Sequence, residues 1–329
     1  MSLKMINKIL IVGPSWVGDM VMAQTLFKLL KKSNNDVVID VLAPDFTLGL
    51  LERMPEVTKK IAMPLGHGTL GIKSRYQLGK ILREENYDQA IILPNSFKSA
   101  LVPWFAKIPK RTGFRGEMRY GVLNDLRVLD KERYPLMVDR FMALGLPKGA
   151  LIPEDFAYPL LTVSEDNLKN IINKLDLKQD REIIALCPGA EFGSAKRWPE
   201  DHYAKFARKK LDAGASVWIF GSPKDAPVAK KINELTGGDC EDLTGKTSLC
   251  DAIDLLSLAS LVISNDSGLM HVAAALDKPL MAIYGPTTAD FTPPLTDKAE
   301  IHSLQLACQP CFQRECPLEH HKCMKELTL

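Results

Sequence analysis

The chain of 329 residues is long enough for two domains of ordinary size. Hydrophobic residues make up 46% of it and charged residues 25%, as is typical of globular proteins. The formal net charge of +2 gives no general reason to expect nucleic acid as a partner. No apolar run is long enough to span a bilayer, and seven cysteines, an odd number, do not suggest a disulfide framework. We therefore expect a globular protein of the cytosol.

In the first half of the chain, short apolar runs alternate with segments of helical periodicity. The expected strands are 9–12, 37–42, 89–93 and a segment around Thr112, and the expected helices are 20–32, 46–53, 76–85 and 99–106. Strands separated by helices predict a parallel sheet that is covered on both faces. A segment with Pro147, Pro153 and Pro159 and weak periodicity follows, which indicates an interdomain connection.

The same alternation resumes in the second half. The expected strands are 182–187, 216–220, 261–264 and 279–284, and the expected helices are 163–175, 201–214, 226–236 and 268–276. The pattern predicts an α/β fold with two doubly wound domains, 1–158 and 159–305, and a cysteine-containing tail, 306–329. Two such halves are expected to hold a ligand in a crevice at the carboxyl edges of their sheets.

An acidic residue follows the first expected strand. The loop from Gly13 to Gly18 has the glycine spacing of a phosphate-binding loop, but Asp19 stands where such a loop has its lysine. A carboxylate there would repel a triphosphate, and the glycine interval does not fit a dinucleotide fold. At the start of a helix, Asp19 would stay ionised and could act as a general base. The alternative is a simple helix cap.

A second polar turn follows the apolar run that begins at Leu261. It reads Ser264-Asn-Asp-Ser-Gly268, and a helical pattern continues through His271. The free N–H groups at the start of such a helix favour an anion, most often a phosphate. The carboxylate of Asp266 would prefer ligand hydroxyl or N–H groups. Here too a helix cap is the alternative, and His271 is expected to pack against the site.

Other loops of the second half would line the same rim. A glycine-containing loop ends in Lys196-Arg197-Trp198-Pro199, which places positive charge just before a helix. The turns at residues 221–225 and 285–288 follow two further strands. A lysine and a helix N-terminus beside one crevice suit a diphosphate, although a Lys-Arg pair alone is usually solvated surface.

These motifs together resemble the ADP-heptose:lipopolysaccharide heptosyltransferases, glycosyltransferase family 9. The resemblance rests on Gly18-Asp19, on Lys196-Arg197-Trp198-Pro199 and on Asn265-Asp-Ser-Gly-x-x-His271, and it covers essentially the whole chain. It implies a GT-B fold of two Rossmann-like domains facing a central cleft, with the acceptor bound by the first domain, the ADP-sugar by the second, and the tail 306–329 packing back toward the first domain. It also implies an inverting transfer that needs no cofactor and no metal.

Residue roles follow from the resemblance position by position. Asp19 would be the base and Lys196 would neutralise the leaving ADP phosphates. The implied donor-binding residues are Gly193, Ser194, Lys196, Gly221, Asp266, Ser267, Gly268, Leu269 and His271. The family carboxylate that holds the adenosine ribose has no certain counterpart, because Ser222-Pro223-Lys224 precedes Asp225.

The resemblance is strongest to members that transfer heptose from ADP-L-glycero-D-manno-heptose onto the first heptose of the inner core. The implied partners are this donor and the anionic lipopolysaccharide core, with no nucleic acid and with peripheral contact at the cytoplasmic face of the inner membrane. The acceptor candidates, in a basic region of the first half, are Lys98, Arg111, Arg115 and Arg119.

Three other functions stay open at this point. The chain could transfer the first heptose onto Kdo, or it could be a GT-B nucleotide-sugar epimerase, which would act without an acceptor. It could also be a non-catalytic module that binds a metal or a partner through the tail cysteines Cys308, Cys311, Cys316 and Cys323. Four close cysteines are compatible with zinc, but their spacing is irregular for common zinc modules, and reduced thiols are the alternative.

Overall fold

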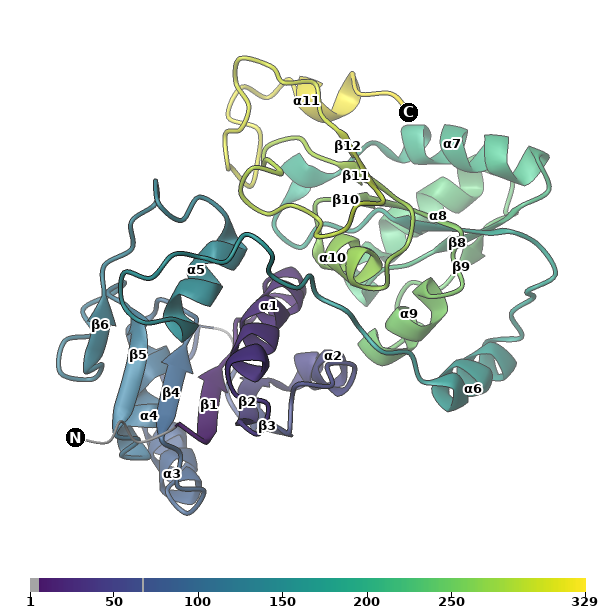
Figure 1. Ribbon diagram of the computed structural model, residues 1–329. Coiled ribbons are helices and arrows are strands. Elements are labelled where there is room, and N and C mark those ends of the chain that lie inside the picture. Colours follow the sequence, from purple (N-terminus) through teal and green to yellow (C-terminus); the bar gives the residue numbers. More distant parts are fainter. Residues whose placement is uncertain (1–5, 67) are drawn as a thin grey trace. The chain divides into compact units, whose positions relative to one another are not determined.

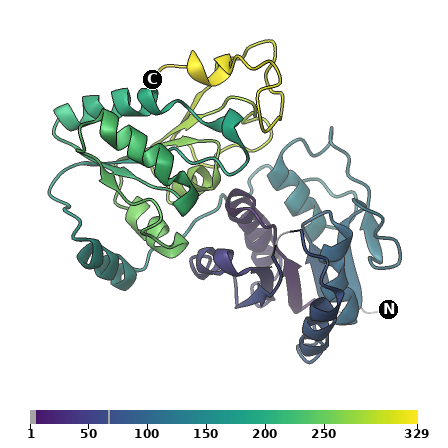
Figure 2. The same ribbon diagram turned by 180° about the vertical axis from the view of Figure 1, so that it is seen from behind.

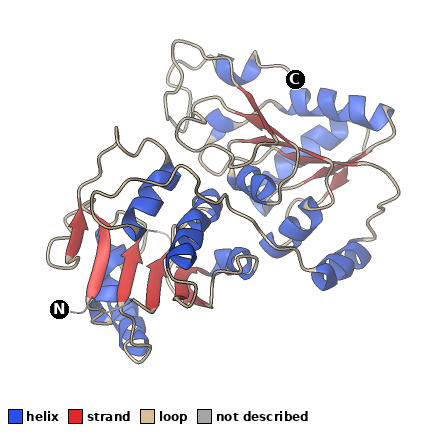
Figure 3. Ribbon diagram, in the orientation of Figure 1, coloured by secondary structure: helices blue, strands red, loops and turns tan. Residues whose placement is uncertain are grey.

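The chain folds into two α/β units. The computed structural model describes residues 6–66 and 68–329. The first unit ends at Pro159 and the second begins at Leu160, next to the boundary after residue 158 that the sequence analysis expects. Figures 1 and 3 show that helices and strands alternate along both units.

The N-terminal unit is a six-stranded parallel sheet with helices on both faces. Its strands are β1 (Lys8–Val12), β2 (Val38–Pro44), β3 (Lys59–Met63), β4 (Gln89–Ile92), β5 (Lys110–Phe114) and β6 (Asp125–Arg127). Its helices are α1 (Val17–Ser33), α2 (Leu48–Glu52), α3 (Ile72–Leu82), α4 (Leu101–Phe105) and α5 (Met137–Gly145). α1 packs on α5 at one face and α3 packs on α4 at the other, as Figures 1 and 2 show from opposite sides.

The C-terminal unit repeats this architecture. Its strands are β7 (Ile183–Cys187), β8 (Ser216–Ile219), β9 (Glu241–Asp242), β10 (Leu261–Asn265), β11 (Leu280–Ile283) and β12 (Ala299–His302). Its helices are α6 (Glu165–Leu175), α7 (Glu200–Asp212), α8 (Ala226–Leu235), α9 (Leu249–Leu256), α10 (Gly268–Ala275) and α11 (Lys322–Lys325). α7 packs on α8, while α9 packs on α6 and α10.

Both sheets have the same strand order. The N-terminal order is β3-β2-β1-β4-β5-β6, and the C-terminal order, taken from its other edge, is β9-β8-β7-β10-β11-β12. All pairings of named strands are parallel. In this doubly wound order the strands are added first toward one edge and then toward the other, so the order switches beside the first strand of each sheet. Ligands of such folds bind outside the carboxyl ends of the strands at that point.

The central strands owe their position to continuous apolar sequence. Every residue of β7 is buried, and so are residues 9–12 of β1. A strand that is apolar on both faces must be covered by helices on both faces. The predicted α/β fold class of two doubly wound parallel sheets is therefore confirmed.

The structure adds elements that the sequence analysis does not predict. β3, β6, β9 and β12 are the edge strands of the two sheets, and β12, which pairs with β11 after the expected strand 279–284, has no buried residue. α5 and α9 are short helices that were also not expected. A capping box at Ser248 and Asp251 starts α9, and this Ser-x-x-Asp pattern is a signal that the sequence contains.

The tail after β12 is held by the C-terminal unit. The indole N–H of Trp198 donates to the carbonyl of Leu327 (2.9 Å), and the Phe312 N–H donates to the carbonyl of Pro286 (2.8 Å). Met324 and Leu327 join the apolar core beside α7. These contacts make residues 306–329 part of the C-terminal unit, and their packing toward the N-terminal domain stays a prediction.

Among residues 6–66 and 68–329, no helix combines the length and the hydropathy that a membrane span would need.

Candidate functional site

The C-terminal unit brings its predicted donor residues together at the switch point of its sheet. β7 and β10 are neighbours in the sheet, with Cys187 aligned to Ser264. The loop after β7 carries Lys196 in a short 3-10 turn (Ser194–Lys196), and the turn after β10 carries Asp266. Because the strands are parallel, both loops leave the same edge.

Lys196 and Asp266 form a buried ion pair. The Nζ atom of Lys196 lies 2.6 Å from Oδ2 of Asp266 and 3.3 Å from its carbonyl oxygen. The two side chains are 12% and 5% exposed. The hydroxyl of Thr287, in the turn after β11, donates to the same carboxylate oxygen at 2.6 Å. One carboxylate thus fixes a cation and a hydroxyl from two other loops. Sequence reasoning placed the 285–288 turn on the rim but did not select Thr287.

Asn265 fixes the frame around this pair. Its amide donates to the carbonyl of Pro188 (2.7 Å). Its side-chain oxygen accepts from the Trp198 N–H (3.2 Å) and from the hydroxyl of Tyr203 (3.0 Å). Asn265 is completely buried, so each of these bonds replaces contact with water. The carboxamide therefore ties the end of β10 to both ends of the loop that carries Lys196.

The start of α10 lies directly after Asp266. Ser267 is its N-cap residue in an extended conformation and forms no side-chain capping bond, and Gly268 and Leu269 begin the helix. Helix N-termini of this kind offer N–H groups to an anion. His271, one turn further on, is 4% exposed, and burial lowers its pKa to about 4. Its imidazole is therefore neutral near pH 7.

Two predicted glycines stand where the backbone is crowded. A Cβ at Gly193 would come within 2.2 Å of the carbonyl oxygen of Arg314, and one at Gly221 within 2.8 Å of Cβ of Asp225. Ser194, next to Gly193, is exposed. The carboxylate of Asp225 accepts from the N–H and the hydroxyl of Ser222, so it caps the short 3-10 turn Pro223–Asp225 that precedes α8.

The proposed base lies on the N-terminal unit. α1 begins at Val17 rather than at residue 20, which places Asp19 in its first turn, partly buried. The positive end of the helix dipole favours a carboxylate at that position. The exposed indole of Trp16 stands at the N-cap of the same helix, with 44% of its surface accessible.

The acceptor candidates do not share one environment. Arg115 is exposed and Lys98 is partly exposed. Arg111 donates from its guanidinium to the carbonyls of Val122 and Ile108. Arg119 is completely buried and donates to the carbonyl oxygens of Pro94 and Phe114. The expectation that Arg119 contacts the acceptor is therefore corrected. Its enclosed guanidinium supports the loops and has no accessible surface for a ligand.

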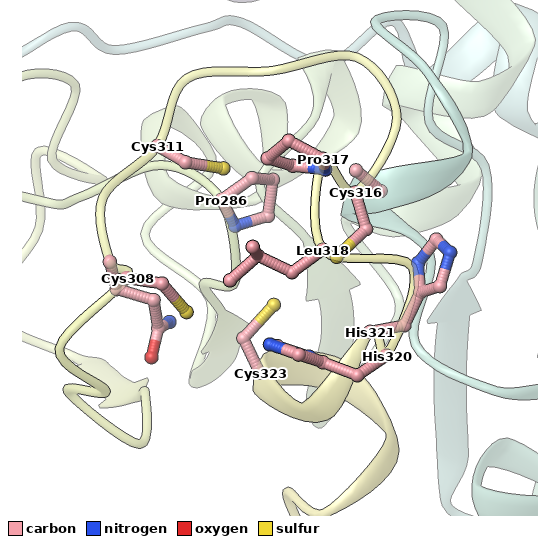
Figure 4. A pocket seen from close by; sticks show the side chains of 11 residues that line it. Pro286, Cys308, Cys311, Cys316, Pro317, Leu318, His320, His321 and Cys323 are labelled. Carbon is pink, nitrogen blue, oxygen red and sulfur yellow. The ribbon is translucent and has the colours of Figure 1, made fainter.

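The tail cysteines gather at one place on the C-terminal unit. Figure 4 shows Cys308, Cys311, Cys316 and Cys323 around a small pocket that is also lined by His320 and His321. Their thiols are free. Burial and the neighbouring thiols raise the pKa of Cys323 to about 11. Within residues 6–66 and 68–329, no three Cys, His, Asp or Glu side chains are placed to hold a metal ion.

Comparison with known proteins agrees with this fold. Residues 75–322 match the model of glycosyltransferase family 9 (heptosyltransferase). Lipopolysaccharide heptosyltransferase 2 of Escherichia coli is 48% identical over 98% of this chain and 95% of its own length. Lipooligosaccharide heptosyltransferase 2 of Haemophilus influenzae is 50% identical over 89% of this chain and 87% of its own. The solved structure of the E. coli ADP-heptose LPS heptosyltransferase II has a TM-score of 0.85, 46% identity and 96% coverage of both chains.

The two doubly wound parallel-sheet units and the solved structure that they match place the chain among the glycosyltransferases with the GT-B fold. Within that class the chain belongs to glycosyltransferase family 9, the heptosyltransferases. The resemblance drawn from the sequence motifs is therefore confirmed, and so is the expectation that the protein is an enzyme that transfers a sugar.

Proposed function

We propose that this enzyme transfers L-glycero-D-manno-heptose from ADP-heptose onto the first heptose of the lipopolysaccharide inner core. The observation that carries the proposal is the buried Lys196–Asp266 pair beside the N-terminus of α10. Curated relatives that are 48% identical over nearly the whole chain are named heptosyltransferase 2, which supports the second-heptose assignment.

The C-terminal unit would bind the donor. The ammonium of Lys196 and the N–H groups of Ser267, Gly268 and Leu269 suit the diphosphate, which gains negative charge as the bond to the sugar breaks. Groups that interact more strongly with this charge in the transition state accelerate the transfer. Asp266 holds Lys196 in place and is the candidate to accept hydrogen bonds from donor hydroxyls. His271, being neutral, can donate one N–H without adding charge.

The N-terminal unit would bind the acceptor and supply the base. Asp19 takes the proton from the acceptor hydroxyl while that oxygen attacks the anomeric carbon and the carbon–oxygen bond to ADP breaks. One carboxylate is sufficient for such a single displacement with inversion, and base catalysis of this kind is worth about two to four powers of ten. Lys98 and Arg115, which are accessible, and Arg111, in part, remain the candidates for contact with the anionic core.

The acceptor is anchored in a membrane, and we propose peripheral contact of the N-terminal unit at the cytoplasmic face. Met118 and Tyr120 are 81% and 60% exposed, in the segment that connects β5 to β6 and also carries Arg115. Exposed apolar side chains beside a cation are the combination that binds an anionic lipid surface.

The test is acceptor-dependent release of ADP from ADP-heptose. We expect turnover with a lipid A–Kdo acceptor that bears one heptose, and loss of turnover in Asp19→Ala with donor binding retained. Turnover with the heptose-free acceptor only would make the chain a first-heptose transferase. Conversion of ADP-heptose without any acceptor would favour an epimerase. Absence of both, with ADP binding also absent, would contradict the proposal.

A further inference from the structure

The tail lies against the loop that carries Lys196, and this contact involves Arg314. The N–H of Ala195 donates to the carbonyl oxygen of Arg314 at 3.1 Å. Gly193 approaches the same carbonyl so closely that a Cβ would lie 2.2 Å from it. The main chain of Arg314 is therefore fixed beside the turn that ends in Lys196.

The side chain of Arg314 lies near the same aromatic ring as Lys196. The guanidinium carbon is 5.6 Å from the ring centroid of Phe192, and the Nζ atom of Lys196 is 4.9 Å from that centroid. Both distances are within the range of cation–π attraction. One ring thus holds two cations from separate segments at the place where the donor diphosphate is expected.

The charges of the two cations are not equally available. Lys196 is neutralised by the carboxylate of Asp266 at 2.6 Å. Arg314 is exposed, and among the described residues no carboxylate forms an ion pair with its guanidinium. A diphosphate that binds beside Lys196 therefore meets a buried pair with little net charge, and it needs a second cation.

We propose that Arg314 is a donor-binding residue whose guanidinium contacts the diphosphate of ADP-heptose beside Lys196. The planar guanidinium presents paired N–H groups that match two phosphate oxygens, and its carbon lies 5.6 Å from the ring centroid of Phe192, which supports it beside Lys196. The proposal rests on the proposed function, because it takes ADP as the bound nucleotide. It assigns the tail a part in substrate binding.

The experiment compares ADP with adenosine, which lacks both phosphates. Affinities for each are measured by ligand-observed NMR titration for the wild type, Arg314→Ala, Arg314→Lys and Lys322→Ala. Lys322 is an exposed lysine of the same tail, so its variant controls for the general loss of one positive charge. Thermal unfolding of each variant is measured in parallel. The Arg314→Ala substitution leaves the carbonyl that Ala195 uses, so we expect an unchanged fold.

The expected result is a loss of about ten-fold in ADP affinity for Arg314→Ala, since a charge-assisted hydrogen bond is lost. Adenosine affinity should stay the same, Arg314→Lys should recover part of the loss, and Lys322→Ala should match the wild type. Equal weakening of ADP and adenosine, an equal loss in Lys322→Ala, or no loss at all would overturn the assignment.

The two proposals fail in distinguishable ways. Wild-type protein that binds ADP and turns over the donor, with no ADP-specific loss in Arg314→Ala, would leave the proposed function standing and remove only Arg314. Wild-type protein that binds no ADP would contradict the proposed function itself.

Discussion

The Nζ atom of Lys196 lies 2.6 Å from Oδ2 of Asp266, a residue 70 positions further along the chain, and both side chains are almost completely buried. In a pair of this kind each charge neutralises the other. A single buried charge would instead carry a high desolvation cost. The pairing makes Lys196, which we propose binds the diphosphate, and the carboxylate of the polar turn one structural unit. A change in either residue should therefore affect both stability and donor binding.

Lys196→Met removes the cation and leaves the carboxylate of Asp266 buried without its ionic partner. We expect a loss of about 3 kcal/mol in the free energy of unfolding and a fall in kcat of about two to three powers of ten. Urea denaturation and the ADP-release assay measure the two effects. Lys205→Met, which breaks only an exposed pair with Asp201, should change stability by less than about 0.5 kcal/mol. Similar results for the two variants would contradict the burial argument.

Thr287→Val tests the hydroxyl that supports the carboxylate. The substitution keeps the shape of the side chain and removes the hydrogen bond to Asp266, which should cost about 2 kcal/mol because the acceptor is charged and buried. Thr288→Val is the matched control, since that hydroxyl bonds to Asp290 at an exposed position. Its expected effect is less than about 0.5 kcal/mol. Donor KM should rise in Thr287→Val, and an unchanged KM with normal stability would refute the support role.

Substitutions of Arg119 and Arg115 should differ in their effect on stability, because Arg119 is buried and Arg115 is exposed. Arg119→Leu removes the guanidinium that donates to the carbonyl oxygens of Pro94 and Phe114, so we expect a loss of about 3 kcal/mol in unfolding free energy. Arg115→Ala removes an exposed side chain and should leave stability within about 0.5 kcal/mol. Chemical denaturation of both variants measures the free energy of unfolding. If Arg119→Leu proves as stable as Arg115→Ala, the structural reading of Arg119 is wrong.

His271 should make the protein less stable in mild acid. Its pKa is lowered by burial to about 4 in the folded chain, against an ordinary value of 6.5. The unfolded chain therefore binds the proton more readily than the folded chain. The contribution of the neutral imidazole to the free energy of unfolding is complete above about pH 6.5 and is lost as the pH falls toward 4. The expected loss between about pH 7.5 and pH 5 is about 2 kcal/mol.

Urea denaturation of the wild type and of His271→Gln over this range isolates the contribution, since only the wild type should show the additional loss. NMR titration of the imidazole gives an independent reading. An imidazole that titrates near 6.5 in the folded protein would show that burial does not control its charge.

The central strands and the site loops could be predicted because their sequence signals are local. β1 and β7 are continuous apolar runs that end in turns with glycine or proline, and such runs require cover on both faces wherever they are placed. The polar turn at Asp266 and the cation at Lys196 follow such strands directly, so the topology of a parallel sheet already assigns both to its carboxyl edge.

The edge strands could not be predicted in this way. β3 has one buried residue, Ile61, and β9 has only two residues, Glu241 and Asp242. Their extended conformation is set by hydrogen bonds to β2 and β8, and those partners are distant in sequence. A hydrophobic pattern does not report such pairing, because an edge strand needs little apolar surface.

The sequence by itself determined the fold class, the order of the loops and the chemical types of the side chains at the site. Only the tertiary structure decided which of these side chains meet. It paired Lys196 with Asp266, enclosed Arg119 and brought Arg314 of the tail to Phe192. The physical reason is that charge and hydrogen-bonding capacity belong to a residue, whereas burial and pairing depend on packing between segments that are far apart along the chain.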